Sequence, residues 1–415
     1  MFELAINFYL ILYEINNFIY CFQLKHKMQK LKIFLSFFIF FSFFFFLADK
    51  FLEKPPILEV IKPEIQQTPN ILTKDDLALA QSSDEFFKQI LKRTRFNGAI
   101  LVARGGKIVF EEYAGLKEVT KGDPIDSITS FHLASVSKTI TAMAVLKLYQ
   151  DSLLTLDDPF YNHINNFPYP EITIRHLLTH RSGLPNYVHF IENMGWDTQK
   201  TLTNQDLLEW IVTRHKQLKT GKSGRYFDYC NTNYALLALL IEKVSRMSFS
   251  NYLDSIFFKP LKMDQTFVFS MDKADKVLPS FKFNNKKEPF MFLDAVYGDK
   301  NIYSSPRDIL KWDNAISNGK IFSQATLDEA YKGYSYEKPG IRNYGLGWRL
   351  YEMPSGKKII YHNGWWHGNN TVYSRLPSDS TTIIVLGNKF NRSIYQAKRI
   401  ASIFDGYGLN DTQEE

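Results

Sequence analysis

The chain has 415 residues, of which 45% are hydrophobic and 22% charged, a composition that excludes a disordered, collagen-like or fully membrane-embedded protein. Its 50 basic and 43 acidic residues leave a formal charge of +7, and the basic residues form no long block. Nucleic acid is therefore not an expected partner.

The first pattern along the chain is an uncharged, phenylalanine-rich run at residues 33–48, preceded by four lysines between residues 25 and 32. This layout is typical of an export signal. A cleaved signal peptide and an uncleaved transmembrane helix both stay open, because a helix of this length spans only about 24 Å of the ~30 Å hydrocarbon core. In both cases we expect residues 1–32 to be cytoplasmic, unless part of this segment lies upstream of the true start of translation. The rest of the chain is expected outside, periplasmic or anchored to the cytoplasmic membrane.

The remainder divides into three parts. Residues 49–84 contain several prolines and are predicted to form an extended linker, in which a short helix can begin near Thr73. Residues 85–405 are predicted to fold as one domain, and residues 406–415 to form a polar tail.

Within the domain, strand-type and helix-type patterns alternate in blocks. Residues 97–113 predict a hairpin that turns at a pair of glycines, and residues 135–150 predict a buried helix. Further helices are predicted at 204–216 and 233–248, and four β-type runs follow residue 340. Strands from both ends of the domain can therefore share one sheet, with a helical region inserted between them.

The first group with chemical meaning is Ser135 and Lys138 at the start of the predicted buried helix. Spacing i to i+3 puts both side chains on one helix face. A serine hydroxyl becomes a good nucleophile when a nearby base takes its proton, and a buried lysine can be that base. The same pair could also be a helix-capping serine beside a solvated lysine, so the pattern is weak on its own.

A second group, Tyr229 and Asn231, lies just before the helix at 233. A tyrosine between two cationic groups can act as a base, and the asparagine offers a donor and an acceptor to an amide substrate. The alternative is a loop tyrosine that packs in the core beside a capping asparagine.

A third group follows the apolar run that begins at residue 357. Gly364 would let a substrate lie against the strand edge, because it has no Cβ. His362 can donate to a substrate carboxylate or help move a proton, and we expect it to be mostly neutral at pH 7. The backbone N–H of Trp365 could pair with that of Ser135 as an oxyanion hole. The alternative is a histidine at a strand end beside a turn glycine.

In this order and at these intervals, the three groups resemble the motifs of the serine β-lactamase and penicillin-binding protein superfamily, most closely the class C β-lactamase-related serine hydrolases. The resemblance covers roughly residues 85–405. It implies an α/β (α+β) fold, in which an antiparallel sheet is flanked by helices and an all-helical region is inserted. It also implies that no metal or cofactor is needed. The catalytic residues it implies are Ser135, Lys138 and Tyr229; the substrate-binding and oxyanion residues are Asn231, His362, Gly364 and Trp365.

Other motifs in the sequence are given less weight. His176 and His180 have the spacing of zinc ligands on a helix, but they lack the usual glutamate. A Lys-Thr-Gly at 219–221 precedes the tyrosine motif, whereas the family's third motif follows it. Cys21 and Cys230 are too few and too far apart in the sequence to suggest a disulfide framework.

We therefore predict an exported serine hydrolase that acts through an acyl-enzyme on Ser135. Its substrate would be a D-amino-acid peptide, a carboxylester or a β-lactam-like molecule, and peptidoglycan is a candidate source given export. His362 stands where β-lactamases carry lysine, which favours a peptidase or esterase over a true β-lactamase. The alternative is a membrane-tethered, catalytically inactive penicillin-binding-like protein. The substrate itself and the oligomeric state stay open.

Overall fold

The computed structural model describes residues 13–14 and 72–408, and the second range lies within one compact unit, Leu58–Glu415. The predicted export segment at 33–48 and Cys21 lie outside the described residues. Among the described ranges, no helix combines the length and the apolar character needed to cross a membrane.

A seven-stranded antiparallel sheet forms the centre of this unit, with the strand order β2-β1-β12-β11-β10-β9-β8. The strands are β1 (Gly98–Arg104), β2 (Lys107–Ala114), β8 (Arg342–Tyr344), β9 (Arg349–Glu352), β10 (Lys358–Trp366), β11 (Asn369–Leu376) and β12 (Thr381–Gly387). Strand β1 pairs along its whole length with β12, so both ends of the domain share the sheet, as predicted.

The predicted hairpin is β1 and β2. Gly105 and Gly106 connect the two strands with φ of 55° and 79°, the left-handed conformation that glycine adopts without strain. The hairpin occupies one edge of the sheet, and the short strand β8 occupies the other.

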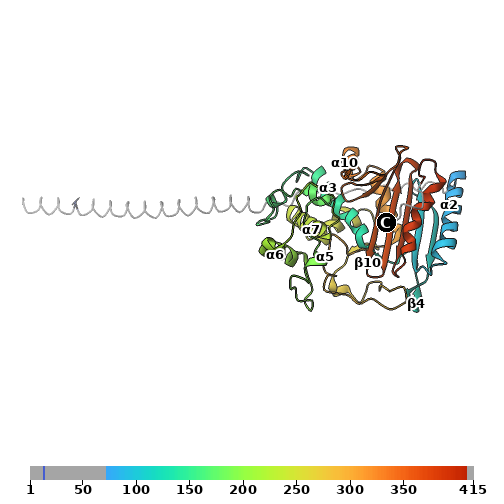
Figure 1. The fold of residues 1–415 in the computed structure, drawn as a ribbon, viewed down its shortest axis with the longest axis horizontal. Coiled ribbons are helices and arrows are strands. Elements are labelled where there is room, and N and C mark those ends of the chain that lie inside the picture. The colour runs from blue at the N-terminus through green and yellow to red at the C-terminus, as the bar shows by residue number, and fades with distance from the viewer. Residues whose placement is uncertain (1–12, 15–71, 409–415) are drawn as a thin grey trace, which may run out of the picture. The chain divides into compact units, whose positions relative to one another are not determined.

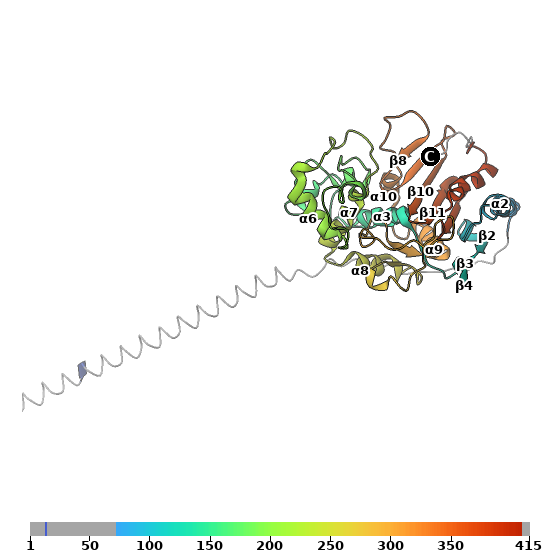
Figure 2. The same ribbon diagram turned by 60° about the horizontal axis from the view of Figure 1, so that its bottom comes forward.

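Most helices lie between β2 and β8 in the sequence. They are α3 (Ser137–Gln150), α4 (Ile174–Leu178), α5 (Tyr187–Phe190), α6 (Asn204–Arg214), α7 (Asn231–Ser245), α8 (Phe249–Leu253), α9 (Pro306–Ser317) and α10 (Gln324–Ala330). Figure 1 shows α3, α5, α6 and α7 gathered beside the sheet, and Figure 2 shows α3, α6 and α7 together from another side. Residues 137–148 of α3 are all buried, because this helix packs against α7 inside the domain. The prediction of an inserted helical region is confirmed.

Two small sheets complete this region. One pairs β3 (Leu116–Glu118) with β4 (Lys121–Pro124), and the other has the order β5-β7-β6. Strand β5 (Phe131–His132) leads directly into the segment with Ser135, and it pairs with β7 (Ile302–Ser304), which pairs with β6 (Phe267–Val268).

The large sheet separates two hydrophobic cores. Alternate residues of each strand face opposite sides. On β10, Ile360 packs into the core shared with the helical region, whereas Ile359 and Tyr361 pack into a second core. This second core is covered by α2 (Lys74–Phe86) and by the 3₁₀ helix η8 (Arg392–Ile403). Strand alternation therefore places His362 and Gly364 on the face toward the helical region and Asn363 on the far face.

The described part of the predicted linker belongs to the folded domain. The Thr73 side chain caps α2 by accepting a hydrogen bond from the backbone N–H of Asp76, which fits a helix start near Thr73. Residues 74–84 are nevertheless helical rather than extended, and α2 packs against β2 and η8 (Figure 1). Similarly, Tyr407, in the segment expected to be a polar tail, is completely buried in the second core.

Candidate active site

Ser135 lies in a single 3₁₀ turn, η2 (Ala134–Val136), immediately before α3. Ala134 has φ of 48°, an unusual backbone conformation for a residue with a side chain. The N–H of Ser137 donates to the carbonyl groups of Ala134 and Ser135, which ties the turn to the helix. Ser135 itself is half-buried and thus reachable from outside.

Lys138 is completely buried one turn after Ser135. Its Nζ lies 3.0 Å from Ser135 Oγ and donates to the Asp299 carbonyl oxygen at 2.7 Å. The structure thus brings together the two residues that the i to i+3 spacing predicted. Asp299 was not foreseen, because it lies 161 residues away in the sequence.

Tyr229 lies in the loop before α7, between two cations. Its ring centroid is 5.1 Å from Lys138 Nζ and 5.3 Å from Arg349 Cζ. The sequence predicted a tyrosine between two cationic groups but did not identify the second one, Arg349 on β9. Both cations thus lie close to the tyrosine ring, as expected for cation–π contacts.

Asn231 is the first residue of α7, two residues after Tyr229. Its side-chain oxygen is buried and accepts no hydrogen bond within the described structure. A buried hydrogen-bond acceptor without a donor costs free energy. A ligand that donates an N–H to this oxygen would remove that cost.

His362 is on β10 and is completely buried. Its Nε2 lies 3.3 Å from the Tyr344 hydroxyl, and its ring centroid lies 6.1 Å from that of Tyr229. Burial, followed by the charges of Arg349 and Lys138, holds the pKa of His362 well below its ordinary value. The neutral imidazole expected from the sequence therefore agrees with its surroundings, and the side chain is buried within the domain.

A chain of hydrogen bonds links His362 to the loop of Tyr229 through two residues that the sequence analysis did not identify as functional. The backbone N–H of Cys230 donates to His180 Nδ1 at 3.1 Å, so neutral His180 carries its proton on Nε2. That N–H donates to the Tyr344 oxygen at 3.1 Å, and the Tyr344 hydroxyl then donates to His362 Nε2. His362 Nδ1–H donates in turn to the Asn363 carbonyl oxygen at 2.7 Å. The order of donors requires both histidines to be neutral, and burial lowers the pKa of each.

His180 is thus part of this chain, whereas the sequence pattern had suggested only a zinc ligand. His176, which shares the zinc-ligand spacing, accepts a hydrogen bond from the backbone N–H of Thr173 at the start of α4. Gly221 of the Lys-Thr-Gly at 219–221 donates its N–H to the Gly183 carbonyl oxygen, so that motif braces a loop. Cys230 is buried, and burial raises the pKa of its thiol to about 11.

The structure gives a packing reason for Gly364 that the sequence did not indicate. A Cβ at this position would lie 2.2 Å from Thr371 Oγ1, 2.5 Å from the Leu133 carbonyl oxygen and 3.0 Å from Ala134 Cβ. The glycine therefore admits the turn that carries Ser135 against the strand. Strand β9 pairs with residues 358–361 of β10, so residues 362–366 lie beyond that pairing and next to η2.

Trp365 follows on the same strand, and its side chain is 65% exposed. The indole Nε1 donates to the His367 carbonyl oxygen at 2.8 Å, and the ring contacts Phe390. Because η2 packs against this part of β10, the backbone N–H groups of Ser135 and Trp365 belong to adjoining segments, as an oxyanion hole requires.

A second buried lysine supports the residue that holds Lys138. Lys300 Nζ donates to the Tyr187 hydroxyl, which donates to the Asp299 carboxylate at 3.0 Å. Lys300 and Asp299 also form an ion pair at 3.5 Å, and burial lowers the pKa of Lys300. These contacts fix the peptide whose carbonyl oxygen binds Lys138. Nothing in the sequence of the segment around residue 299 indicated this role.

Comparison with known proteins agrees with this arrangement. The chain is 31% identical over 333 residues to penicillin-binding protein 4* of Bacillus subtilis (strain 168), a match that covers 75% of this chain and 72% of the relative. Two solved structures share the fold. A penicillin-binding protein from Bacillus halodurans has a TM-score of 0.67 at 22% identity, covering 77% of this chain and 99% of that one. The D-amino acid amidase from Ochrobactrum anthropi has a TM-score of 0.64 at 21% identity, covering 79% and 99%.

These similarities agree with the resemblance found in the motifs and confirm the predicted fold class. The sequence model described as Beta-lactamase matches residues 83–405, a range that contains the seven-stranded sheet, the helical region and all the residues of the site. The chain therefore belongs to the beta-lactamase family, whose members are generally serine hydrolases.

Proposed function

We propose that the protein is an exported serine acyl hydrolase that works through an acyl-enzyme on Ser135. The observation that carries the proposal is the 3.0 Å contact between Lys138 Nζ and Ser135 Oγ, with the lysine completely buried. An amine that touches a hydroxyl is placed to take its proton, and a serine hydroxyl is a weak nucleophile without that help.

The reaction begins when Ser135 Oγ attacks the carbonyl carbon of the substrate and its proton passes to Lys138 Nζ or to the Tyr229 oxygen. The backbone N–H groups of Ser135 and Trp365 stabilise the resulting oxyanion. When the intermediate collapses, the bond to the amine or alcohol breaks and the leaving group takes the stored proton. Water then attacks the acyl ester while Tyr229 accepts a proton. That proton returns to Ser135 Oγ as the carboxylic acid departs.

The surroundings of the nucleophile favour an amide or ester over a β-lactam as substrate. His362, at the position where β-lactamases carry a lysine, is buried and neutral and offers no charge to a substrate. Arg349 supplies the second positive charge from a different strand, β9. The unfilled acceptor on Asn231 further favours a substrate that carries an N–H beside the scissile carbonyl, as a peptide or amino-acid amide does.

Export would bring such a site close to peptidoglycan, whose D-amino-acid amide bonds fit this description. The proposal agrees with the names of the relatives, a penicillin-binding protein and a D-amino acid amidase. A groove of ≈ 830 Å³ is lined by Phe227, Tyr344 and Arg349 among others, of which Tyr344 contacts His362 and Arg349 contacts Tyr229.

Covalent labelling of the full chain tests the proposal. A fluorescent penicillin and a fluorophosphonate should label the wild type but not Ser135→Ala. Ser137→Ala, which removes the neighbouring serine hydroxyl, should still be labelled. In a hydrolysis screen, D-amino-acid amides, D-Ala-D-Ala peptides or p-nitrophenyl esters should be turned over faster than nitrocefin. A folded wild type that neither probe labels would overturn the proposal in favour of a membrane-tethered, inactive binding protein.

The export part of the proposal has its own test. A reporter that is active only outside the cytoplasm, fused after residue 60, should be active. A reporter that works only in the cytoplasm should be silent at the same position. The reverse pattern would contradict export and remove the argument for a peptidoglycan substrate, while leaving the chemistry of Ser135 untouched.

A further inference from the structure

The peptide bond that joins Gly364 to Trp365 is contacted from the far face of the sheet. Tyr395 of η8 donates its hydroxyl hydrogen to the Gly364 carbonyl oxygen at 2.9 Å. Asn370 Nδ2 donates to the same Tyr395 oxygen at 2.7 Å. Because a tyrosine hydroxyl has one hydrogen to give, the bond received from Asn370 leaves that hydrogen for Gly364.

This contact acts on the oxyanion hole because one peptide group carries both atoms. The Gly364 carbonyl and the Trp365 N–H belong to the same planar, trans peptide and point in opposite directions. A hydrogen bond at the oxygen therefore fixes the plane in which the N–H lies. It also polarises the peptide, so that the N–H becomes a stronger donor.

The other donor of the oxyanion hole is held in a comparable way. The carbonyl of Ala134, in the peptide that carries the Ser135 N–H, accepts a hydrogen bond from the N–H of Ser137. In addition, Thr371 Oγ1 donates to the Leu133 carbonyl oxygen at 2.7 Å, on the face of the sheet toward the helical region. Thr371 and Asn370 are consecutive residues of β11, so their side chains point to opposite faces of the sheet. On one face Thr371 holds the segment before Ser135, and on the other face Asn370 holds Tyr395.

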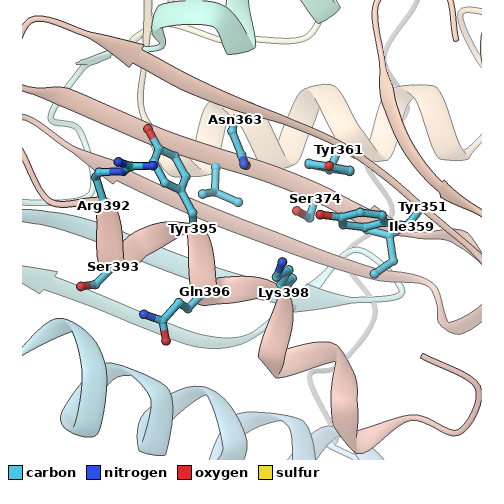
Figure 3. A pocket seen from close by; sticks show the side chains of 11 residues that line it. Tyr351, Ile359, Tyr361, Asn363, Ser374, Arg392, Ser393, Tyr395, Gln396 and Lys398 are labelled. Atoms are coloured by element: carbon cyan, nitrogen blue, oxygen red, sulfur yellow. The ribbon is translucent and has the colours of Figure 1, made fainter. Parts of the chain in front are cut away.

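Tyr395 stands at the wall of a cavity, not in a tightly packed core. Figure 3 shows Tyr395 rising from η8 toward β10, with Asn363 pointing into the same space. The cavity has a volume of ≈ 330 Å³ and is also lined by Tyr351 and Tyr361, whose rings stack at a centroid distance of 4.7 Å. Removing one hydroxyl here would change the hydrogen bond to Gly364 with little loss of packing.

We propose that Tyr395 is a positioning residue of the oxyanion hole: from the opposite face of the sheet, its hydroxyl holds and polarises the peptide that presents the Trp365 N–H. The inference rests on the proposed function of Ser135. Tyr395 itself touches neither the substrate nor the nucleophile. Its hydrogen bond should stabilise the tetrahedral intermediate, in which the oxyanion forms. It should not change the binding of substrate in the ground state.

Kinetics of Tyr395→Phe test this role. With active sites counted by a fluorescent penicillin, kcat on the best ester or amide should fall about fivefold, as for one lost hydrogen bond, while KM changes little. The affinity of a boronic acid, which forms a tetrahedral adduct with the serine, should fall by the same factor. Tyr351→Phe makes the same change in the same cavity away from Gly364 and should leave all three values unchanged. Wild-type kcat and boronate affinity in Tyr395→Phe would overturn the proposal.

A spectroscopic measurement separates this inference from the proposed function. The chain has six tryptophans, so protein labelled with ¹⁵N-tryptophan gives few backbone amide signals, and Trp365→Phe assigns one of them. Tyr395→Phe should shift the Trp365 amide resonance, and Tyr351→Phe should not. An unshifted resonance would overturn the proposed hold on the peptide even in an active enzyme. A shifted resonance in a chain whose wild type acylates no probe would support the hold and overturn the proposed function instead.

Discussion

At the scale of single residues, few charged side chains lie close to the nucleophile Ser135. Lys138 binds a hydroxyl, a carbonyl oxygen and the faces of aromatic rings. The nearby histidines, His180 and His362, are neutral members of a hydrogen-bond chain. The positive charge at Tyr229 therefore comes from Lys138 on one side and from Arg349 on the other.

Replacing Lys138 tests the base directly. Lys138→Ala should lower the rate of acylation by about 10²–10⁴-fold, because Ser135 loses the group that takes its proton. Lys138→Arg keeps a positive charge but cannot accept a proton, and it should be as slow as the alanine variant. Stopped-flow labelling with a fluorescent penicillin measures both rates. Near-normal acylation in Lys138→Arg would show that charge alone is sufficient.

Arg349 is predicted to act on charged substrates. Arg349→Met should lower kcat/KM for substrates with a free carboxylate, such as D-Ala-D-Ala peptides, by about tenfold, the effect of one charged contact. Neutral p-nitrophenyl esters should lose less. Arg342→Met removes another arginine that lines the same groove and serves as the control. Equal losses on both kinds of substrate would show that Arg349 acts through Tyr229 alone.

At the scale of elements, the decisive contact is between the 3₁₀ turn η2 and strand β10. The turn approaches the strand so closely that only a glycine fits at position 364. The Thr371 hydroxyl on β11 then ties the Leu133 carbonyl, just before the turn, to the sheet. This junction sets the distance between the two backbone donors of the proposed oxyanion hole.

Adding one methyl group at the junction should separate the two elements. Gly364→Ala places a Cβ 2.5 Å from the Leu133 carbonyl oxygen, so the turn must move. We expect a loss of about 1–3 kcal/mol in the free energy of unfolding, and of about 10²-fold in kcat as the donors move apart. Thermal unfolding and ester hydrolysis measure the two effects. Gly408→Ala, where no atom lies within 4 Å of the new Cβ, should show neither.

At the scale of the whole molecule, three buried histidines link folding to pH. Burial lowers the pKa of His132 to about 4, and those of His180 and His362 well below the ordinary value. Between about pH 6.5 and these lower values, the unfolded chain binds protons that the folded chain excludes. These histidines should therefore leave the free energy of unfolding unchanged above about pH 6.5. Below that pH, the free energy of unfolding should decrease as the pH falls.

The predicted slope is about 1.4 kcal/mol per pH unit for each histidine, hence about 4 kcal/mol per unit in that window. Urea unfolding at pH 7.5, 6.0 and 5.0 measures it. Carboxylates with lowered pKa values, such as Asp294, add to the loss only below about pH 4. His132→Gln should reduce the slope by about a third, whereas His189→Gln, at an exposed position, should leave it unchanged. A flat profile from pH 7.5 to 5.0 would contradict the prediction.

Local sequence patterns were sufficient to predict many of the structural elements of this protein. The glycine pair of the first hairpin, the helices and the return of strands after residue 340 follow from periodicity and turn chemistry, which depend on residues close in the sequence. The Ser135 and Lys138 pair has the same basis, because one helical turn separates the two residues. The order of the three motifs indicated the family. No local signal, however, showed that residues 74–84 pack on the sheet, because that contact joins the two ends of the domain.

The tertiary structure decided which distant residues support the nucleophile and its surroundings. Arg349, Asp299 and Tyr395 reach the site from segments far from Ser135 in the sequence, and their side chains follow no repeating pattern that would reveal the contact. The same holds for the close approach of the Leu133 backbone to Gly364. The sequence by itself thus determined which groups could do the chemistry. Only the folded sheet could determine which of them meet, because long-range contacts depend on strand pairing and on the face to which each side chain points.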